Sequence, residues 1–368
     1  MSPACAPRAR RGADAAESSA AASSAAESSV RRGIRDIAGR PPRQGLGRSC
    51  QNTPVTRLTD PTAHHATRRR IRWLPVALAV FAGIVLLGGV VLLAIWLRAQ
   101  PAVQEFLTRY PGTTPLPEGA PIGIPAWLGW QHFLNAFFLV LLVRSGLLLK
   151  KGGRPPARWV RNNDGLIRTK NPPWKVSIHL WLHYTVDVLW VLNGIVFIVL
   201  LLVTGQWMRI VPTSADIWPN AVSAGLQYAS LDWPVEHAWV NYNSLQLLSY
   251  FAIVFVVAPL AVLTGLRLSS VWPQRAERLN AVYPVKLARA VHYPVMLVFV
   301  AFVIVHVTLV FATGALRNLD AMYASRDGAS WLGFAIFAVS LAVMIGGWFA
   351  VRPSVLKPVA SRMGTVTR

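Results

Sequence analysis

The chain has 368 residues, of which 54% are hydrophobic and only 14% are charged, against a usual charged share of about 25%. This composition argues against an ordinary soluble domain. The formal net charge is +22, but the basic residues lie between long apolar runs, so we expect them to meet an anionic membrane leaflet and not a nucleic acid. The two cysteines, Cys5 and Cys50, both lie in a polar N-terminal stretch, which argues against a disulfide framework and excludes iron–sulfur ligation within this chain.

Residues 1–70 are predicted to form a disordered basic tail. They are rich in alanine, serine and arginine and contain almost no aromatic residues, a composition that does not bury enough apolar surface to fold. His64 and His65 fall in this tail and are expected to be solvated.

Six apolar runs after the tail are each long enough to cross a hydrocarbon core of about 30 Å, which takes roughly 20 helical residues. They cover residues 74–97, 127–149, 182–205, 245–267, 291–313 and 331–351. The first run, at about 24 residues, exceeds a signal-peptide core of roughly 7 to 15 residues, so a retained anchor helix is expected over 71–98. The predicted fold class is an all-α membrane protein with six transmembrane helices.

The loop charges predict the orientation, because Lys and Arg near membrane ends stay in the cytoplasm. Segments 150–175 and 267–289 carry eight and five basic residues against one acidic residue each, whereas the alternate loops balance both signs. Since four arginines also precede the first run, both termini are expected in the cytoplasm. The outer loop 206–244 contains four tryptophans and is expected to lie at the level of the lipid headgroups.

Five histidines lie in or near the apolar runs, namely His132, His179, His183, His292 and His306. An ionisable side chain in a membrane helix is costly and usually faces the bundle interior. His292 and His306 are 14 residues apart in the fifth run, which is about 21 Å along a helix and within roughly 40° of the same face. One helix can therefore present imidazoles toward both sides of the bilayer.

The topology gives each of these two histidines a partner at the same depth. His306 and His132 both lie near the outer face, while His292 and His183 lie near the inner face. Two pairs separated across the membrane match bis-histidine ligation of two b-type haems. A hydrolytic metal site would need more ligands and an open position. The expected metal ligands are thus these four histidines, and no catalytic residue is expected.

His179 leaves an alternative open at the inner site, because it lies one turn before His183 on the same face. We favour His183 as the ligand, since the run from it to Thr204-Gly205 parallels the run from His292 to Thr313-Gly314. His179 then lies nearer the surface, beside a haem propionate or at the interface.

Three further residues are candidates for haem contacts. Gly146 falls at the depth of the inner haem and Gly194 falls toward the outer one, where a glycine lets a flat macrocycle approach the backbone. Arg144 lies toward the inner end of its helix, where it pairs with Asp187, neutralises a propionate or extends its charge to the interface.

Three sequence features resemble a known family: the stretch WQHFLNAFFLVLLVRSG around His132, the helix-start His183, and HYPVMLVFVAFVIVH across 292–306. They are similar to the cytochrome b561-type membrane subunits of respiratory formate dehydrogenases and nickel–iron hydrogenases. The resemblance implies a four-helix di-haem core over 127–314, with His132 and His306 on one haem and His183 and His292 on the other. An anchor helix over 71–98, a C-terminal transmembrane helix within 315–352 and a basic cytoplasmic tail over 353–368 are additions to that core.

Such subunits carry electrons between a peripheral redox subunit and membrane quinone. The resemblance therefore implies an electron-transfer subunit of a respiratory oxidoreductase complex in a bacterial inner membrane, and not a catalyst by itself. Its expected partners are membrane lipid, quinone and a peripheral dehydrogenase or reductase, with a quinone site in the outer loop 206–244 near His237. The alternative from another class is a haem-free, proton-coupled transporter whose histidines relay protons.

Overall fold

The computed structural model describes residues 73–164, 168, 173–234 and 237–368. The chain divides into two units, Met1–Arg70 and Ile71–Arg368. The predicted tail, with its two cysteines and His64 and His65, lies outside the described residues.

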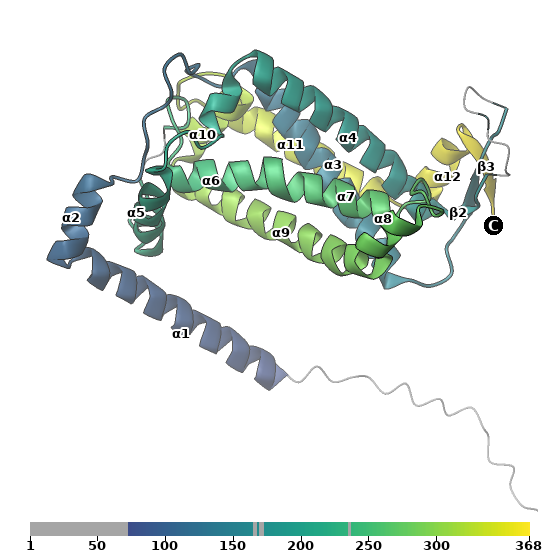
Figure 1. Ribbon diagram of the computed structural model, residues 1–368, viewed down its shortest axis with the longest axis horizontal. Coiled ribbons are helices and arrows are strands. Elements are labelled where there is room, and N and C mark those ends of the chain that lie inside the picture. Colours follow the sequence, from purple (N-terminus) through teal and green to yellow (C-terminus); the bar gives the residue numbers. More distant parts are fainter. Residues whose placement is uncertain (1–72, 165–167, 169–172, 235–236) are drawn as a thin grey trace, which may run out of the picture. The chain divides into compact units, whose positions relative to one another are not determined.

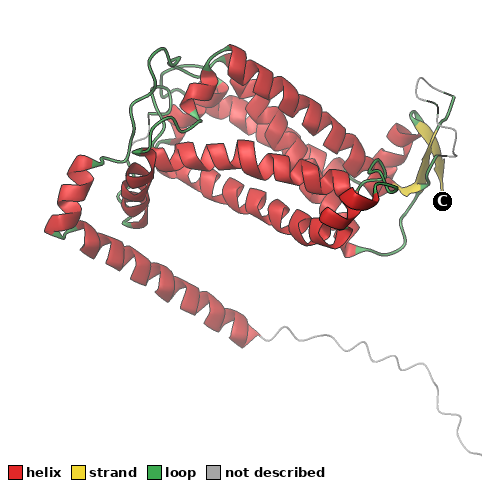
Figure 2. Ribbon diagram, viewed as in Figure 1, coloured by secondary structure: helices red, strands yellow, loops and turns green. Residues whose placement is uncertain are grey.

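The prediction of an all-α fold with six helices long and apolar enough to span a membrane is confirmed for the described residues (Figure 2). Their mean hydropathy runs from 1.8 to 2.9, and they expose large apolar side chains, as expected of helices covered by lipid. They are α1 (Trp73–Arg98), α3 (Ala126–Lys151), α4 (Ile178–Val203), the combined α6 and α7 helix (Ser244–Leu268), α9 (Val285–Ala312) and α11 (Trp331–Ala350).

Shorter elements join these helices at the two ends of the bundle (Figure 1). One end, which we call the α10 end, has α2 (Pro101–Arg109), the 3-10 helix η1 (Gln206–Arg209), α5 (Ile217–Ala229) and α10 (Ala315–Tyr323). The other, which we call the sheet end, has α8 (Glu277–Val282), α12 (Pro353–Ser361), β1 (Arg158–Arg161), β2 (Val176–Ser177) and β3 (Gly364–Thr367).

The four helices of the predicted core lie side by side, with α3 packed along α4 and α7 packed along α9 (Figure 1). The sixth span, α11, packs on α3. Gly347 permits this contact, because a Cβ there would lie 2.9 Å from the ring of Phe137. Within α1, by contrast, only Ala94 is buried, and its last residue, Arg98, pairs with Asp232 at 2.7 Å.

The fourth span changes its helical geometry midway. A π-helical segment (Ile253–Val257) joins α6 (Ser244–Ala252) to α7 (Ala258–Leu268). Pro259 has no backbone N–H and its ring crowds the preceding turn, which a wider π turn accommodates. The segment lies between Tyr250 and Thr264, both of which contact histidines of α9.

The C-terminal segment 353–367 is folded against the loop between α3 and α4, whereas the sequence suggested only a basic tail. β3 pairs antiparallel with β1 in a sheet of order β2-β1-β3. The indole of Trp159 donates a hydrogen bond of 3.0 Å to the carbonyl oxygen of Ala360. Leu356 and Ala360 are buried against Trp181 of α4, so the burial of apolar surface holds this segment in place.

A buried carboxylate fixes the turn between α10 and α11. Asp320 is fully buried and accepts hydrogen bonds from the backbone N–H groups of Ser330 (2.7 Å) and Gly333 (2.8 Å) and from the Ser330 hydroxyl (2.9 Å). Burial raises the pKa of this carboxyl, but the hydrogen bonds and the charge of Arg326 outweigh it, so the pKa lies below its ordinary value. The carboxylate therefore caps the first turn of α11 in its charged form.

Asp320→Ala is expected to lower the free energy of unfolding by about 2 kcal/mol, because one buried and two partly buried donors lose their acceptor. The matched control is Asp327→Ala in the same turn, whose carboxylate is exposed and pairs with His237, and whose loss should change stability by less than about 0.5 kcal/mol. Thermal unfolding in detergent measures both. Since the folded-state pKa is lowered, the wild-type advantage should persist at neutral pH and disappear as the pH falls below about 4.

Equal stabilities for the Asp320 and Asp327 variants at neutral pH would contradict this role for Asp320.

Candidate functional site

Four of the histidines form two pairs, and in each pair the two rings come from different helices and lie close together. At the α10 end, His132 of α3 and His306 of α9 have ring centroids 6.2 Å apart with 50° between the ring planes. At the sheet end, His183 of α4 and His292 of α9 have centroids 6.4 Å apart with 80° between the planes. The structure thus brings together the same pairs that depth in the membrane predicts.

The rings of the α10-end pair are held by aromatic neighbours. His306 is stacked on Phe302 at 5.4 Å between centroids with 10° between the planes, and the edge of Tyr250 meets it at 5.8 Å. Tyr323 of α10 packs edge-to-face on His132 at 5.7 Å, and its hydroxyl lies 3.4 Å from Nδ1 of that ring. Burial raises the pKa of Tyr323 to about 12, so the phenol is neutral at physiological pH.

Two hydroxyl side chains hold the sheet-end pair. Oγ of Ser145 lies 2.8 Å from Nδ1 of His183, and Oγ1 of Thr264 lies 2.9 Å from Nδ1 of His292. Each hydroxyl also contacts carbonyl oxygens of its own helix, at 2.9 Å from Leu141 for Ser145 and 2.7 Å from Leu260 for Thr264.

These contacts suit a proton on Nδ1 of each histidine. A hydroxyl that donates its single proton to the backbone carbonyl of its own helix has an oxygen free to accept a hydrogen bond from N–H at Nδ1 of the histidine. Nε2 of His183 and His292 is then unprotonated and has a lone pair for a metal.

A glycine follows each of these hydroxyl residues. A Cβ at Gly146 would lie 3.8 Å from Cε1 of His183, and a Cβ at Gly265 would lie 3.5 Å from Cε1 of His292. A Cβ at Gly194, predicted toward the other pair, would meet no atom within 4 Å. Gly146 thus adjoins the sheet-end pair, as its position in the sequence suggested.

The charged candidates lie beside the sheet-end pair. The guanidinium of Arg144 lies 4.9 Å from the ring centroid of Trp348 on α11, and its Nε is buried with no hydrogen-bond partner among the described residues. Asp187 lies 3.8 Å from Nε2 of His183, and among the described residues no ion pair joins it to Arg144. His179, in the first turn of α4, has Arg144 as a charged neighbour, and it is His183 whose ring faces His292.

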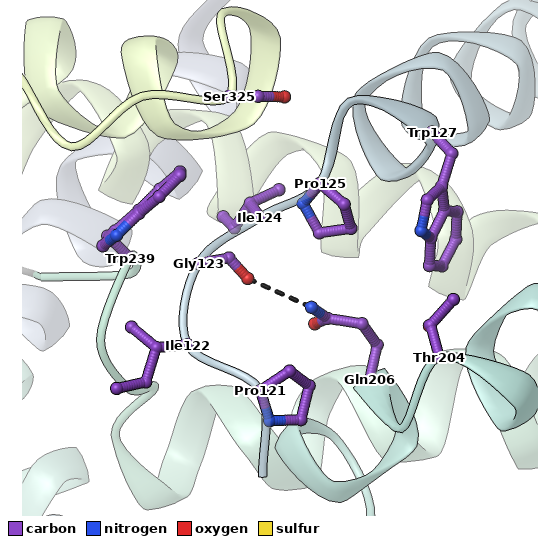
Figure 3. Close-up of a pocket in the computed structure, with 10 residues that line it drawn as sticks. All are labelled: Pro121, Ile122, Gly123, Ile124, Pro125, Trp127, Thr204, Gln206, Trp239 and Ser325. Carbon is purple, nitrogen blue, oxygen red and sulfur yellow. Dashed lines mark hydrogen bonds between the residues drawn. The ribbon is translucent and has the colours of Figure 1, made fainter.

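A pocket of about 380 Å³ opens at the α10 end, between the start of α3 and the end of α4 (Figure 3). Trp127, Trp239, Thr204, Gln206 and the segment 121–125 line it. Nε2 of Gln206 donates a hydrogen bond of 3.2 Å to the carbonyl oxygen of Gly123 (Figure 3). Gly123 has a φ of +93°, and a Cβ there would lie 2.7 Å from the indole of Trp239, so this wall of the pocket requires glycine.

The expected quinone-site residue His237 does not line this pocket. It borders a second pocket, of about 370 Å³, together with Asn241 and Asn243. Nε2 of His237 lies 3.0 Å from Oδ1 of Asp327, and both side chains are exposed.

The family model described as prokaryotic cytochrome b561 matches residues 123–325, which is 203 of the 368 residues. The chain belongs to this family. The resemblance seen in the sequence is therefore confirmed, and the protein is a membrane cytochrome b that binds b-type haem. No curated protein and no solved structure matches the chain.

The two histidine pairs of this cytochrome fit an iron porphyrin between their rings. A metal–imidazole bond of about 2 Å on each side, with about 1 Å from each nitrogen to its ring centre, separates two axial imidazoles by about 6 Å between centroids. The observed separations are 6.2 and 6.4 Å. Nε of Arg144 lies beside the sheet-end pair and has no partner among the described residues, so it suits the carboxylate of a propionate.

Sequence reasoning missed Ser145, Thr264, Gly265, Tyr323 and Trp348. Three of the five share a signal with Gly146, because Ser145-Gly146 and Thr264-Gly265 are both a small hydroxyl residue followed by glycine inside a spanning helix. Tyr323 and Trp348 reach the site from α10 and α11, and no motif in the sequence marks them.

Ser145→Ala and Thr264→Ala are each expected to weaken haem binding at the sheet-end pair by about 10- to 100-fold, because the histidine loses the acceptor that orients its ring. Ser340→Ala is the matched control, since the Ser340 hydroxyl also bonds a carbonyl of its own helix, that of Ile336, and touches no histidine. Haem titration of the purified apo-proteins measures the affinities. The assignment is wrong if the Ser145 and Thr264 variants bind haem as tightly as the Ser340 variant.

Proposed function

We propose that this cytochrome holds two b-type haems, one between His132 and His306 and one between His183 and His292. The observation that carries the proposal is the matched geometry of the two pairs, with ring separations that suit bis-histidine ligation at both ends of α9. Bound haem supplies one-electron transfer at an iron with no open position. The chain's own side chains orient the rings through Ser145 and Thr264 and keep water away by burial.

We further propose that the sheet end faces the cytoplasm of a bacterial cell. The strongly basic segments 150–175 and 267–289 contribute β1 and α8 to this end, where the positive-inside rule predicts the cytoplasm. The C-terminal strand β3 pairs with β1 there. Because Arg98, at the end of α1, pairs with Asp232 of the α10-end segment, the start of α1 falls on the cytoplasmic side as well.

In this orientation the cytochrome is an electron-transfer subunit between membrane quinone and a peripheral dehydrogenase or reductase. The pocket beside Trp127 and Trp239 is the proposed quinone site, because flat aromatic walls suit a quinone ring and Trp127 precedes His132 by little more than one helical turn. It replaces the site first expected around His237. The alternative of a haem-free, proton-coupled transporter does not agree with membership of a haem-binding family.

His306→Leu is expected to reduce the haem content from about two to about one per chain, because only one pair loses a ligand. Pyridine haemochrome assay against protein concentration measures the ratio, and the remaining haem should keep its b-type spectrum. His179→Leu serves as the control and should retain both haems. Unchanged haem content in the His306 variant would contradict the pairing.

Thr204→Trp is expected to slow reduction of the cytochrome by a short-chain quinol several-fold, because the exposed Thr204 lines the pocket and a bulky side chain there occupies it. Val203→Trp is the matched control, since Val203 is also exposed but does not line the pocket. Stopped-flow absorbance of the haem bands gives both rates. The haem content of both variants should stay that of the wild type. Equal rates of haem reduction in the two variants would contradict the assignment of this pocket as the quinone site.

A further inference from the structure

We propose that Tyr323 is a positioning residue that holds His132 through its Nδ1 and lowers the reduction potential of the haem at the α10-end pair, without changing the other haem. This inference rests on the proposed function, because it requires that both pairs hold haem.

α10 is locked in place independently of any haem. A Cβ at Gly129 of α3 would lie 2.5 Å from the carbonyl oxygen of Met322. The backbone of α10 therefore approaches α3 so closely that only glycine fits at this position. On its other side, Gly333 of α11 packs directly on the backbone of Leu319 and Asp320. With the three hydrogen bonds to the buried Asp320 carboxylate, these contacts leave the end of α10 little freedom to move.

This anchoring places the side chain of Tyr323 against His132. The tyrosine ring is held between the ring of Phe337, at 5.7 Å between centroids, and that of His132, also at 5.7 Å with 87° between the planes. Its hydroxyl lies 3.4 Å from Nδ1 of His132. The phenol is therefore placed by α3, α10 and α11 together, and the histidine is the polar group it meets.

The contact corresponds to those at the sheet-end pair, but its chemistry differs. Ser145 and Thr264 belong to helices of the four-helix core and hold their histidines at 2.8 and 2.9 Å. Tyr323 comes from a short helix outside the spans, and its contact is longer. Once Nε2 of His132 binds iron, Nδ1 carries the proton, so the phenol oxygen is the acceptor.

An acceptor at Nδ1 increases the electron donation of an imidazole to its metal and so favours the oxidised iron. A hydrogen bond contributes a net free energy equivalent to about two- to tenfold in an equilibrium. Because the hydrogen bond is present in both oxidation states and is stronger in the oxidised one, removing it should change the ratio of oxidised to reduced haem by at most that factor, which is up to about 60 mV for a one-electron couple. Tyr323 of α10 thus lowers the potential of the haem at the α10-end pair.

Tyr323→Phe in the full-length holo-protein tests this proposal, because it removes the hydroxyl and keeps the ring packing. Spectroelectrochemical titration should show two haems, one with a midpoint potential raised within the range above and the other unchanged. Tyr110→Phe is the matched control, since the Tyr110 ring packs on Phe106 and not on a histidine; it should shift neither haem.

A second variant covers the case in which Tyr323→Phe loses haem. Replacing Tyr323 by 3-fluorotyrosine keeps the shape and weakens the phenol as an acceptor, so one haem should show a smaller upward shift. Two haems with unchanged potentials in either variant would overturn the role of Tyr323 and leave the di-haem proposal intact. A wild-type protein with fewer than two haems would instead refute the proposed function.

Discussion

A neutral imidazole inside a bilayer needs a partner for both of its ring nitrogens, because no water is there to supply one. Three of the four paired histidines meet this need at Nδ1 through a hydroxyl group, from Ser145, Thr264 or Tyr323. The two rings of each pair lie 6.2 and 6.4 Å apart between centroids, a separation that suits an iron atom between them. The packing of the surrounding helices follows from this requirement.

The same arrangement of hydroxyl and glycine occurs in two helices of the core. In α3 and in α7, a hydroxyl residue bonds the carbonyl oxygens of its own helix and lies within hydrogen-bond distance of a histidine of the neighbouring helix. The glycine that follows, Gly146 or Gly265, keeps the flank of the histidine ring free of a side chain. A hydroxyl satisfies the histidine without adding a charge to the membrane interior, and a glycine allows a flat cofactor to approach the backbone.

Elements outside the matched family region complete the bundle. α11 and the C-terminal segment lie beyond residue 325, yet Trp348 covers the guanidinium of Arg144 and Leu356 packs on Trp181 of α4. Asp320 and Gly333 join α10 to α11 at the opposite end. The added sixth helix therefore supports both ends of the core through specific polar and aromatic contacts, and its role goes beyond contact with lipid.

The spans and the histidine pairs could be predicted from the sequence because hydropathy, helical periodicity and loop charge are each properties of a short stretch of chain. His292 and His306 share a face of one helix. Their partners in α3 and α4 follow from the topology, because it places one histidine of each helix at the matching depth. The contacts of Thr264 and Tyr323 were not predictable in this way, since they depend on the π-helical segment before α7 and on the close approach of α10 to Gly129. The pairing of β3 with β1 joins residues about 200 positions apart, a distance at which no local pattern carries information.

Iron content combined with low-temperature EPR of the oxidised wild-type protein tests the central claim most directly. Two histidine pairs that each close around an iron predict about two haem irons per chain, both low-spin as expected for two axial imidazoles. One iron per chain, or a high-spin iron with an open axial position, would contradict the arrangement of His132 with His306 and His183 with His292.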